Sequence, residues 1–184
     1  MWPSSTEGAT RGSRREHGIV LAVVEMELVG VRVELPSNAP IVLLREASGD
    51  RRLLPIFIGG PEATAIAFAL EGVETPRPMT HDLMKDLLDN LGARVERIVV
   101  TELRESTFFA EIHLTVNGTS HEVSSRPSDA IALAVRAGTP IFAAETVLDE
   151  AAYPAAEESE PDQEDVVEQF REFIDKVNPE DFAS

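Results

Sequence analysis

The chain has 184 residues, 43% of them hydrophobic, and a net charge of −17, so it can hold one ordinary domain with a core and some appended segments. It contains no cysteine, which excludes disulfides, thiolate metal sites and cysteine nucleophiles. No apolar run is long enough to span a bilayer, and the short run from Ile19 to Val24 lacks the length of a signal peptide, so we expect a cytoplasmic protein that does not enter a membrane.

The negative charge is concentrated at the C-terminal end. Residues 26–148 have 17 acids and 11 bases, whereas residues 149–184 have 13 acids and two bases. An acidic body repels phosphate backbones at long range, which counts against a high-affinity nucleic-acid binder. A bound divalent metal reverses the local potential, so a metal-assisted hydrolase remains compatible with this charge.

The first predicted elements are strands. Residues 1–25 have no periodicity and are either disordered or an extension upstream of the true start. Alternating apolar residues predict a first strand over 23–35, and the change of phase after Leu28, just before Gly30, predicts a bulge. Turn residues then separate two further strands, predicted over 40–45 and 52–58.

Two helices follow these strands. Pro61 begins the first, which ends at Gly72. Thr80 is the predicted cap of the second, which ends near Gly92. Helical spacing gives the second helix one apolar face, formed by Leu83, Met84, Leu87, Leu88 and Leu91.

The second half of the domain repeats the pattern of the first. Asn117-Gly118 predicts a hairpin turn, because both residues tolerate positive φ. Pro127 precedes a helix that ends at Gly138, with the same spacing as Pro61 and Gly72. The predicted elements are strands over 94–103, 108–116 and 121–125, a helix over 128–136, a strand over 140–143 and a helical turn over 145–150.

These elements predict an α+β domain over residues 26–148, with twisted, mainly antiparallel sheets packed against short alanine-rich helices. The repeated spacing favours an internally duplicated strand-hairpin-helix unit, although two alanine-rich helices can also resemble each other by chance. Residues 149–165 are an expected acidic, flexible linker. Residues 166–178 form an expected amphipathic helix, which docks either on its own domain or on a protein partner.

Polar residues gather where the helices begin. Glu62 and Asp82 lie in first helical turns, where a carboxylate also has a purely structural explanation in the helix dipole. Asp129 lies among apolar neighbours, and a buried carboxylate needs a partner, for which Arg126 and His81 are the candidates. A structural ion pair and a functional site explain Asp129 equally well.

Histidines are the natural proton carriers near neutral pH. His81, beside Asp82, is the best candidate for a general acid or base. His113 and His121 lie on neighbouring predicted strands, and we interpret them as ordinary half-buried residues of a sheet.

Four ordered segments resemble the bifunctional nuclease family, to which this chain is similar over about 120 residues, as a bacterial member. They are Leu54-Pro55-Ile56-Phe57-Ile58-Gly59, Glu62-Ala63, Arg77-Pro78-Met79-Thr80-His81-Asp82-Leu83 and Ser125-Arg126-Pro127-Ser128-Asp129-Ala130-Ile131-Ala132-Leu133-Ala134. The family is credited with cutting both DNA and RNA.

The resemblance implies phosphodiester hydrolysis with a nucleic-acid substrate. On that basis Glu62, Asp82 and Asp129 would act in catalysis and hold Mg²⁺ or Mn²⁺, which prefer oxygen ligands. His81 would move the proton, and Arg77 or Arg126 would bind the phosphate. The same acidic positions can equally be helix caps.

Two other functions remain open. The chain would otherwise be a non-enzymatic, homo-oligomeric interaction protein whose acidic tail recruits a partner, or a small-ligand sensor. Convergence of Glu62, His81, Asp82 and Asp129 in one cleft would favour the nuclease. Trp2 and Tyr153 lie outside the predicted domain, so stacking on a base would depend on phenylalanine alone.

Overall fold

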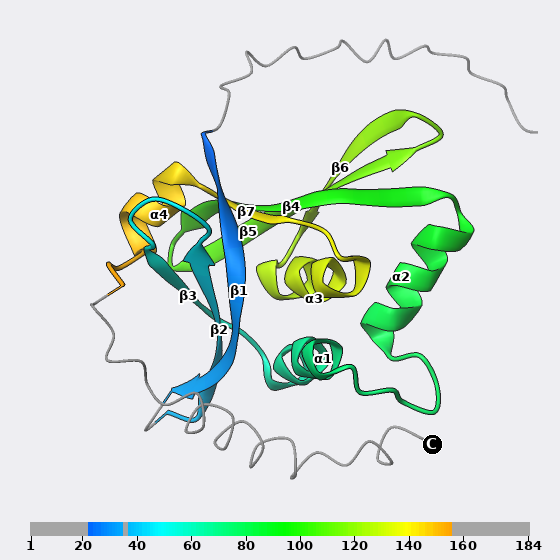
Figure 1. The fold of residues 1–184 in the computed structure, drawn as a ribbon, viewed down its shortest axis with the longest axis horizontal. Coiled ribbons are helices and arrows are strands. Elements are labelled where there is room, and N and C mark those ends of the chain that lie inside the picture. Colours follow the sequence, from blue (N-terminus) through cyan, green and yellow to red (C-terminus); the bar gives the residue numbers. More distant parts are fainter. Residues whose placement is uncertain (1–21, 35–36, 156–184) are drawn as a thin grey trace, which may run out of the picture.

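The computed structural model describes residues 22–34 and 37–155, which form a single seven-stranded sheet and four helices (Figure 1). The sheet has the order β3-β2-β1-β7-β4-β5-β6. Its strands are β1 (Val23–Glu34), β2 (Ala39–Glu46), β3 (Leu53–Phe57), β4 (Ala93–Arg104), β5 (Thr107–Val116), β6 (Thr119–Ser125) and β7 (Ile141–Ala144). The predicted α+β class, with a mainly antiparallel sheet, is confirmed.

Two antiparallel meanders flank the short central strand β7. Strands β1, β2 and β3 form one meander, and β4, β5 and β6 form the other. The central strand is antiparallel to β1 and parallel to β4. Each meander is followed by a helix with a proline at its first or second residue, so both halves contain three strands and then a helix, as the repeated spacing predicts.

Helices α1 (Gly60–Glu71) and α3 (Pro127–Ala137) are the corresponding helices of the two halves. Both end at a glycine in the left-handed conformation, with φ of 64° at Gly72 and at Gly138. The glycine N–H donates back to the carbonyl of Phe68 in α1 and of Ala134 in α3. Only glycine adopts this conformation without a steric penalty, which explains why both helices end there.

The core lies between the sheet and these two helices, which contact each other. Small alanines allow the close approach, and larger side chains such as Ile66, Phe68, Ile131 and Leu133 are completely or almost completely buried. Helix α2 (Thr80–Asn90) packs on α3, and Figure 1 shows α1, α2 and α3 together beneath β4.

The apolar face predicted for α2 is buried only in part. Met84 and Leu88 pack against the core. Leu83, Leu87 and Leu91 are 51%, 54% and 71% exposed. These three residues follow one another at a spacing of four along the helix, so they form one exposed leucine stripe on the outer face of α2.

The bulge predicted before Gly30 is confirmed by a register shift between Leu28 and Gly30. The predicted cap of α2 is wrong by one residue. Thr80 is the first helical residue and Met79 is the cap, because the Met79 N–H donates to the Asp82 carboxylate across 2.9 Å.

The described elements extend a few residues to either side of positions 26–148. Strand β1 begins at Val23. Helix α4 (Glu145–Ala151) ends at Ala151, and Tyr153 pairs with Leu53 at the edge of β3. Residues 1–21 and 156–184, including the helix predicted over 166–178, lie outside the described residues. No helix within the described ranges is long and apolar enough to cross a membrane.

Candidate functional site

The first turns of three helices meet in one cleft. Glu62 lies in the first turn of α1, His81 in that of α2 and Asp129 in that of α3. The cleft has a volume of about 610 Å³. Its polar lining consists of Glu62, Arg77, Thr80, His81, Arg126 and Asp129.

Arg126 joins the two halves of the domain at this cleft. Its Nε donates to Asp129 Oδ2 across 2.7 Å, and its Nη2 donates to Asp129 Oδ1 across 3.0 Å. The same Nη2 donates to Glu62 Oε1 across 2.7 Å. One guanidinium therefore holds a carboxylate from α1 and another from α3 by charge-assisted hydrogen bonds. The Arg126 side chain is still 66% exposed, so it remains accessible to a ligand.

Asp129 is half-buried among buried neighbours, and it has both of the predicted partners. Burial acts to raise the pKa of the Asp129 carboxyl, but the hydrogen bonds from Arg126 and His81 outweigh burial and lower the pKa below its ordinary value. Asp129 is therefore an anion at neutral pH and can only accept hydrogen bonds.

The ionised Asp129 determines which ring nitrogen of His81 carries a hydrogen. His81 Nε2 lies 3.1 Å from Asp129 Oδ1, so Nε2 must be the donor. In a neutral ring this leaves Nδ1 as the nitrogen that can accept a proton. His81 is 6% exposed, so its ring is held in place by the surrounding protein while lining the cleft. A carboxylate that fixes the tautomer and orientation of a histidine is a common arrangement for proton transfer.

Asp82 lies apart from this group. Its Oδ1 accepts from Arg136 Nε across 2.5 Å, and its Oδ2 accepts from the Met79 N–H. Burial opposes the change, but these two hydrogen bonds lower the pKa of the Asp82 carboxyl. Arg136 is almost completely buried, at 8% side-chain exposure, so Asp82 neutralises a buried cation that joins α2 to α3. Glu62, His81 and Asp129 converge as expected, and Asp82 does not.

The three acids assigned to a metal do not form one ligand group. Within the described part of the chain, no set of three or more His, Asp or Glu side chains is arranged to hold a metal ion. Glu62 and Asp129 nevertheless approach the same Arg126 nitrogen, so this pair of carboxylates lies around one cationic group.

Two residues that position side chains in or beside the cleft escaped the sequence interpretation. One is Arg136, whose partnership with Asp82 depends on how α2 packs against α3. The other is Gly59, where a Cβ atom would collide with the Glu62 carboxylate. The second has a local signal, because a glycine three residues before a helical acid leaves space for that side chain to fold back.

The other sheet histidines lie elsewhere. His113 pairs with Glu122 across the β5–β6 ladder, and His121 pairs with Leu114, so the two rings do not face each other directly. His113 lies 3.7 Å from Glu111 and 3.6 Å from Glu122. Both histidines are ordinary sheet residues, and His113 is half-buried as predicted, but the prediction is wrong for His121, which is exposed on the edge strand β6.

The family-level comparison supports the resemblance seen in the sequence. The model of the bifunctional nuclease domain matches residues 42–156, which include every polar residue of the cleft. The chain belongs to this family.

Individual relatives are of two kinds. The chain is 47% identical over 165 residues to an uncharacterized protein of Mycobacterium tuberculosis. This alignment covers 87% of this chain and 98% of that protein. It is 34% identical over 112 residues to bifunctional nuclease 2 of Arabidopsis thaliana and 31% identical over 112 residues to bifunctional nuclease 2 of Oryza sativa. These plant alignments cover 58% of this chain but only 34% of each plant protein.

Proposed function

We propose that this protein is a nuclease that hydrolyses phosphodiester bonds of DNA, RNA or both at the cleft formed by the first turns of α1, α2 and α3. One observation carries the proposal: a histidine oriented by an ionised aspartate shares that cleft with an accessible arginine. Proton transfer and phosphate binding are the two tasks of such a hydrolysis. Membership of the bifunctional nuclease family and the plant relatives named as nucleases support it.

Each residue has a defined role in this proposal. His81 takes a proton from the attacking water through the ring nitrogen that Asp129 leaves available. Asp129 is a positioning residue, because it acts by orienting His81. Arg126 and Arg77 bind the phosphate, and the N-terminal ends of three helices add partial positive charge at the same place.

The acidic charge of the chain is an obstacle that Arg126 helps to overcome. In the structure Nε and Nη2 of its guanidinium contact two carboxylates. A phosphate can bind Arg126 through Nη1, or it can replace one of these carboxylates, because the side chain is highly exposed. Because the domain attracts polyanions weakly at long range and only two arginines are assigned to phosphate, we expect its binding to be short-ranged and its affinity to fall only modestly with added salt.

A divalent ion remains part of the proposal. Mg²⁺ commonly binds through one or two carboxylates together with substrate phosphates, and Glu62 and Asp129 fit that donor set, whereas Asp82 does not. Bound there, Mg²⁺ or Mn²⁺ would neutralise charge and make water more acidic.

The decisive experiment is cleavage of plasmid DNA and of RNA by the purified full chain, with and without a chelator. His81→Gln should lower the rate roughly 100-fold or more, which is the usual contribution of a general acid or base. The matched control is His113→Gln, a histidine with acidic neighbours outside the cleft, which should cleave like the wild type. Equal cutting by His81→Gln and the wild type would refute the assignment, and loss of cutting with the chelator would support the metal.

A second candidate function rests on the exposed leucine stripe of α2. Leu83, Leu87 and Leu91 form a continuous apolar surface, which favours self-association into a homo-oligomer as part of an interaction role. Light scattering of the full chain tests it: Leu87→Glu should reduce the measured mass if α2 forms the interface. The same variant should retain cleavage if oligomerisation and catalysis are separate.

A further inference from the structure

A second cleft shares Arg126 with the cleft that contains His81. It has a volume of about 360 Å³, within the range of small-ligand sites, and it is formed by the end of β3, the turn between β4 and β5, and the start of α3. Arg126 lines both clefts. A ligand that contacts Arg126 therefore has two adjoining surfaces on which its neighbouring parts can lie.

The lining of this second cleft is mainly apolar, with a few hydroxyl groups. Ile56 is buried, and Ile58 and Phe108 pack against the core. Ser106, Thr107 and Ser128 supply hydroxyl groups. Hydrophobic walls with a few polar groups suit a flat, partly polar ring such as a nucleobase.

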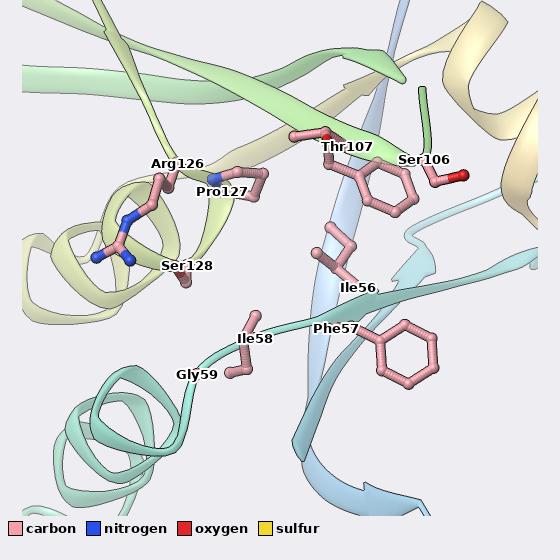
Figure 2. Close-up of a pocket in the computed structure, with 10 residues that line it drawn as sticks. Ile56, Phe57, Ile58, Gly59, Ser106, Thr107, Arg126, Pro127 and Ser128 are labelled. Atoms are coloured by element: carbon pink, nitrogen blue, oxygen red, sulfur yellow. The ribbon is translucent and has the colours of Figure 1, made fainter. Parts of the chain in front are cut away.

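Phe57 is the unusual residue of this cleft. Its side chain is 59% exposed, although it stands at the end of a strand whose other large apolar residues are mostly buried. Figure 2 shows its ring extending from the end of β3, with Arg126 at the opposite end of the cleft. Among the described residues, Phe57 and Tyr153 are the only aromatic side chains that are largely exposed, and Tyr153 is not part of this lining.

We propose that Phe57 is a stacking platform for one base of a single-stranded nucleic acid whose sugar–phosphate chain continues along this cleft to Arg126. The proposal rests on the proposed nuclease function and names the form of its substrate. An exposed aromatic ring binds any base by stacking, without selecting its sequence, which suits an enzyme acting on both DNA and RNA. Bases inside a duplex are already stacked, so the platform requires an unpaired base. The protein should therefore prefer single strands.

The test combines a variant of the full chain with the removal of single bases from the ligand, and asks whether the two losses of affinity are additive. Binding of a short fluorescent single-stranded oligonucleotide is measured by anisotropy, with the intact oligonucleotide and with one in which successive bases are replaced in turn by abasic positions. Phe57→Ala should bind the intact oligonucleotide roughly tenfold more weakly than the wild type. At one abasic position the wild type should lose a similar factor, and Phe57→Ala should lose nothing further.

Two controls separate stacking from general effects. Phe57→Tyr keeps the ring and should bind within about twofold of the wild type. Val123→Ala removes another exposed apolar side chain, on β6, and should also bind like the wild type. Because Phe57 is exposed, Phe57→Ala should fold, which its denaturation curve verifies.

The possible outcomes distinguish the two proposals. Wild-type affinity of Phe57→Ala, or equal further loss by this variant at every abasic position, would overturn the stacking platform while leaving the nuclease intact. Coupled losses in a protein that does not cleave would uphold the platform and refute the nuclease. A wild type that neither binds nor cleaves would overturn both.

Discussion

The two halves of this domain share an architecture but differ in the residues that begin their helices. In the first half, Gly59 and Gly60 precede Pro61 of α1; in the second, Ser125 and Arg126 precede Pro127 of α3. The arginine of the second half reaches Glu62 of the first. The part of the fold that the two halves share thus brings the N-terminal ends of α1 and α3 together. The interaction of Arg126 with Glu62, which has no counterpart in the repeat, gives this place its charged groups.

The largest expected effect is on the free energy of unfolding, and it comes from the buried helix residues that both halves have. Ile66 in α1 and Ile131 in α3 are both fully buried, and truncating either to alanine leaves a cavity. Ile66→Ala and Ile131→Ala should each lower the free energy of unfolding by about 2–5 kcal/mol in urea titrations. Leu70→Ala, on the exposed side of α1, is the matched control and should change it far less.

These two variants also test whether the halves fold together. The sheet is continuous through β7, so each variant should give one transition with an unchanged slope. Two transitions, of which only one moves, would show that the halves are independent and that the resemblance between them is only geometric.

The next effect concerns α2, which has no counterpart in the other half. Asp82→Asn removes the anion that neutralises the almost buried Arg136, and we expect a loss of about 1–2 kcal/mol because Asp82 itself is partly exposed. Cleavage by this variant at neutral pH should stay within severalfold of the wild type, since Asp82 accepts hydrogen bonds from Arg136 and from the Met79 N–H and not from His81 or Arg126. A loss as large as that expected for His81→Gln would return Asp82 to the catalytic group.

Most of the fold could be predicted from local pattern. Proline, glycine and alternating apolar residues determine where strands and helices begin and end, and the bulge at Gly30 and both glycine-ended helices follow from them. The exposed leucines of α2 could not be predicted, because a helical apolar stripe does not reveal which part of it meets the core. The pairing of Tyr153 with Leu53 is equally non-local.

The candidate site could be predicted where the chemistry of one residue requires a particular kind of partner. A carboxylate among buried alanines requires a cation or a donor, and Arg126 and His81 both supply one to Asp129. Asp82 lies next to His81 in sequence but points elsewhere, because adjacent residues on a helix do not face the same side. The role of Arg136 depends on helix packing, which no local spacing contains.

The pH dependence of the free energy of unfolding tests how much the charge of Asp129 stabilises the fold. The pKa of this carboxyl is lowered in the folded state, so the stability it contributes is present above its unfolded pKa of roughly 3.9 and is lost as the pH falls through the folded value. Asp129→Asn should cost about 1 kcal/mol at neutral pH, since solvent screens the exposed Arg126. The difference from the wild type should shrink below about pH 4. A difference that stays constant down to acid pH would mean that the charge of Asp129 does not stabilise the fold.

The smallest expected effect on stability comes from Gly59, which precedes α1 where Arg126 precedes α3. Gly59→Ala places a Cβ atom against the Glu62 carboxylate, which must then leave its position beside Arg126. Gly59 has an ordinary extended conformation, with φ of −77°, so the backbone is not strained and stability should change by less than about 0.5 kcal/mol. Gly60→Ala is the control, because nothing lies within 4 Å of a Cβ atom at that position. Cleavage rates should fall severalfold in Gly59→Ala alone. Equal rates in both variants would show that Glu62 only stabilises the start of its helix. Of the Glu62–Arg126 pair, Arg126 alone would then act on the substrate.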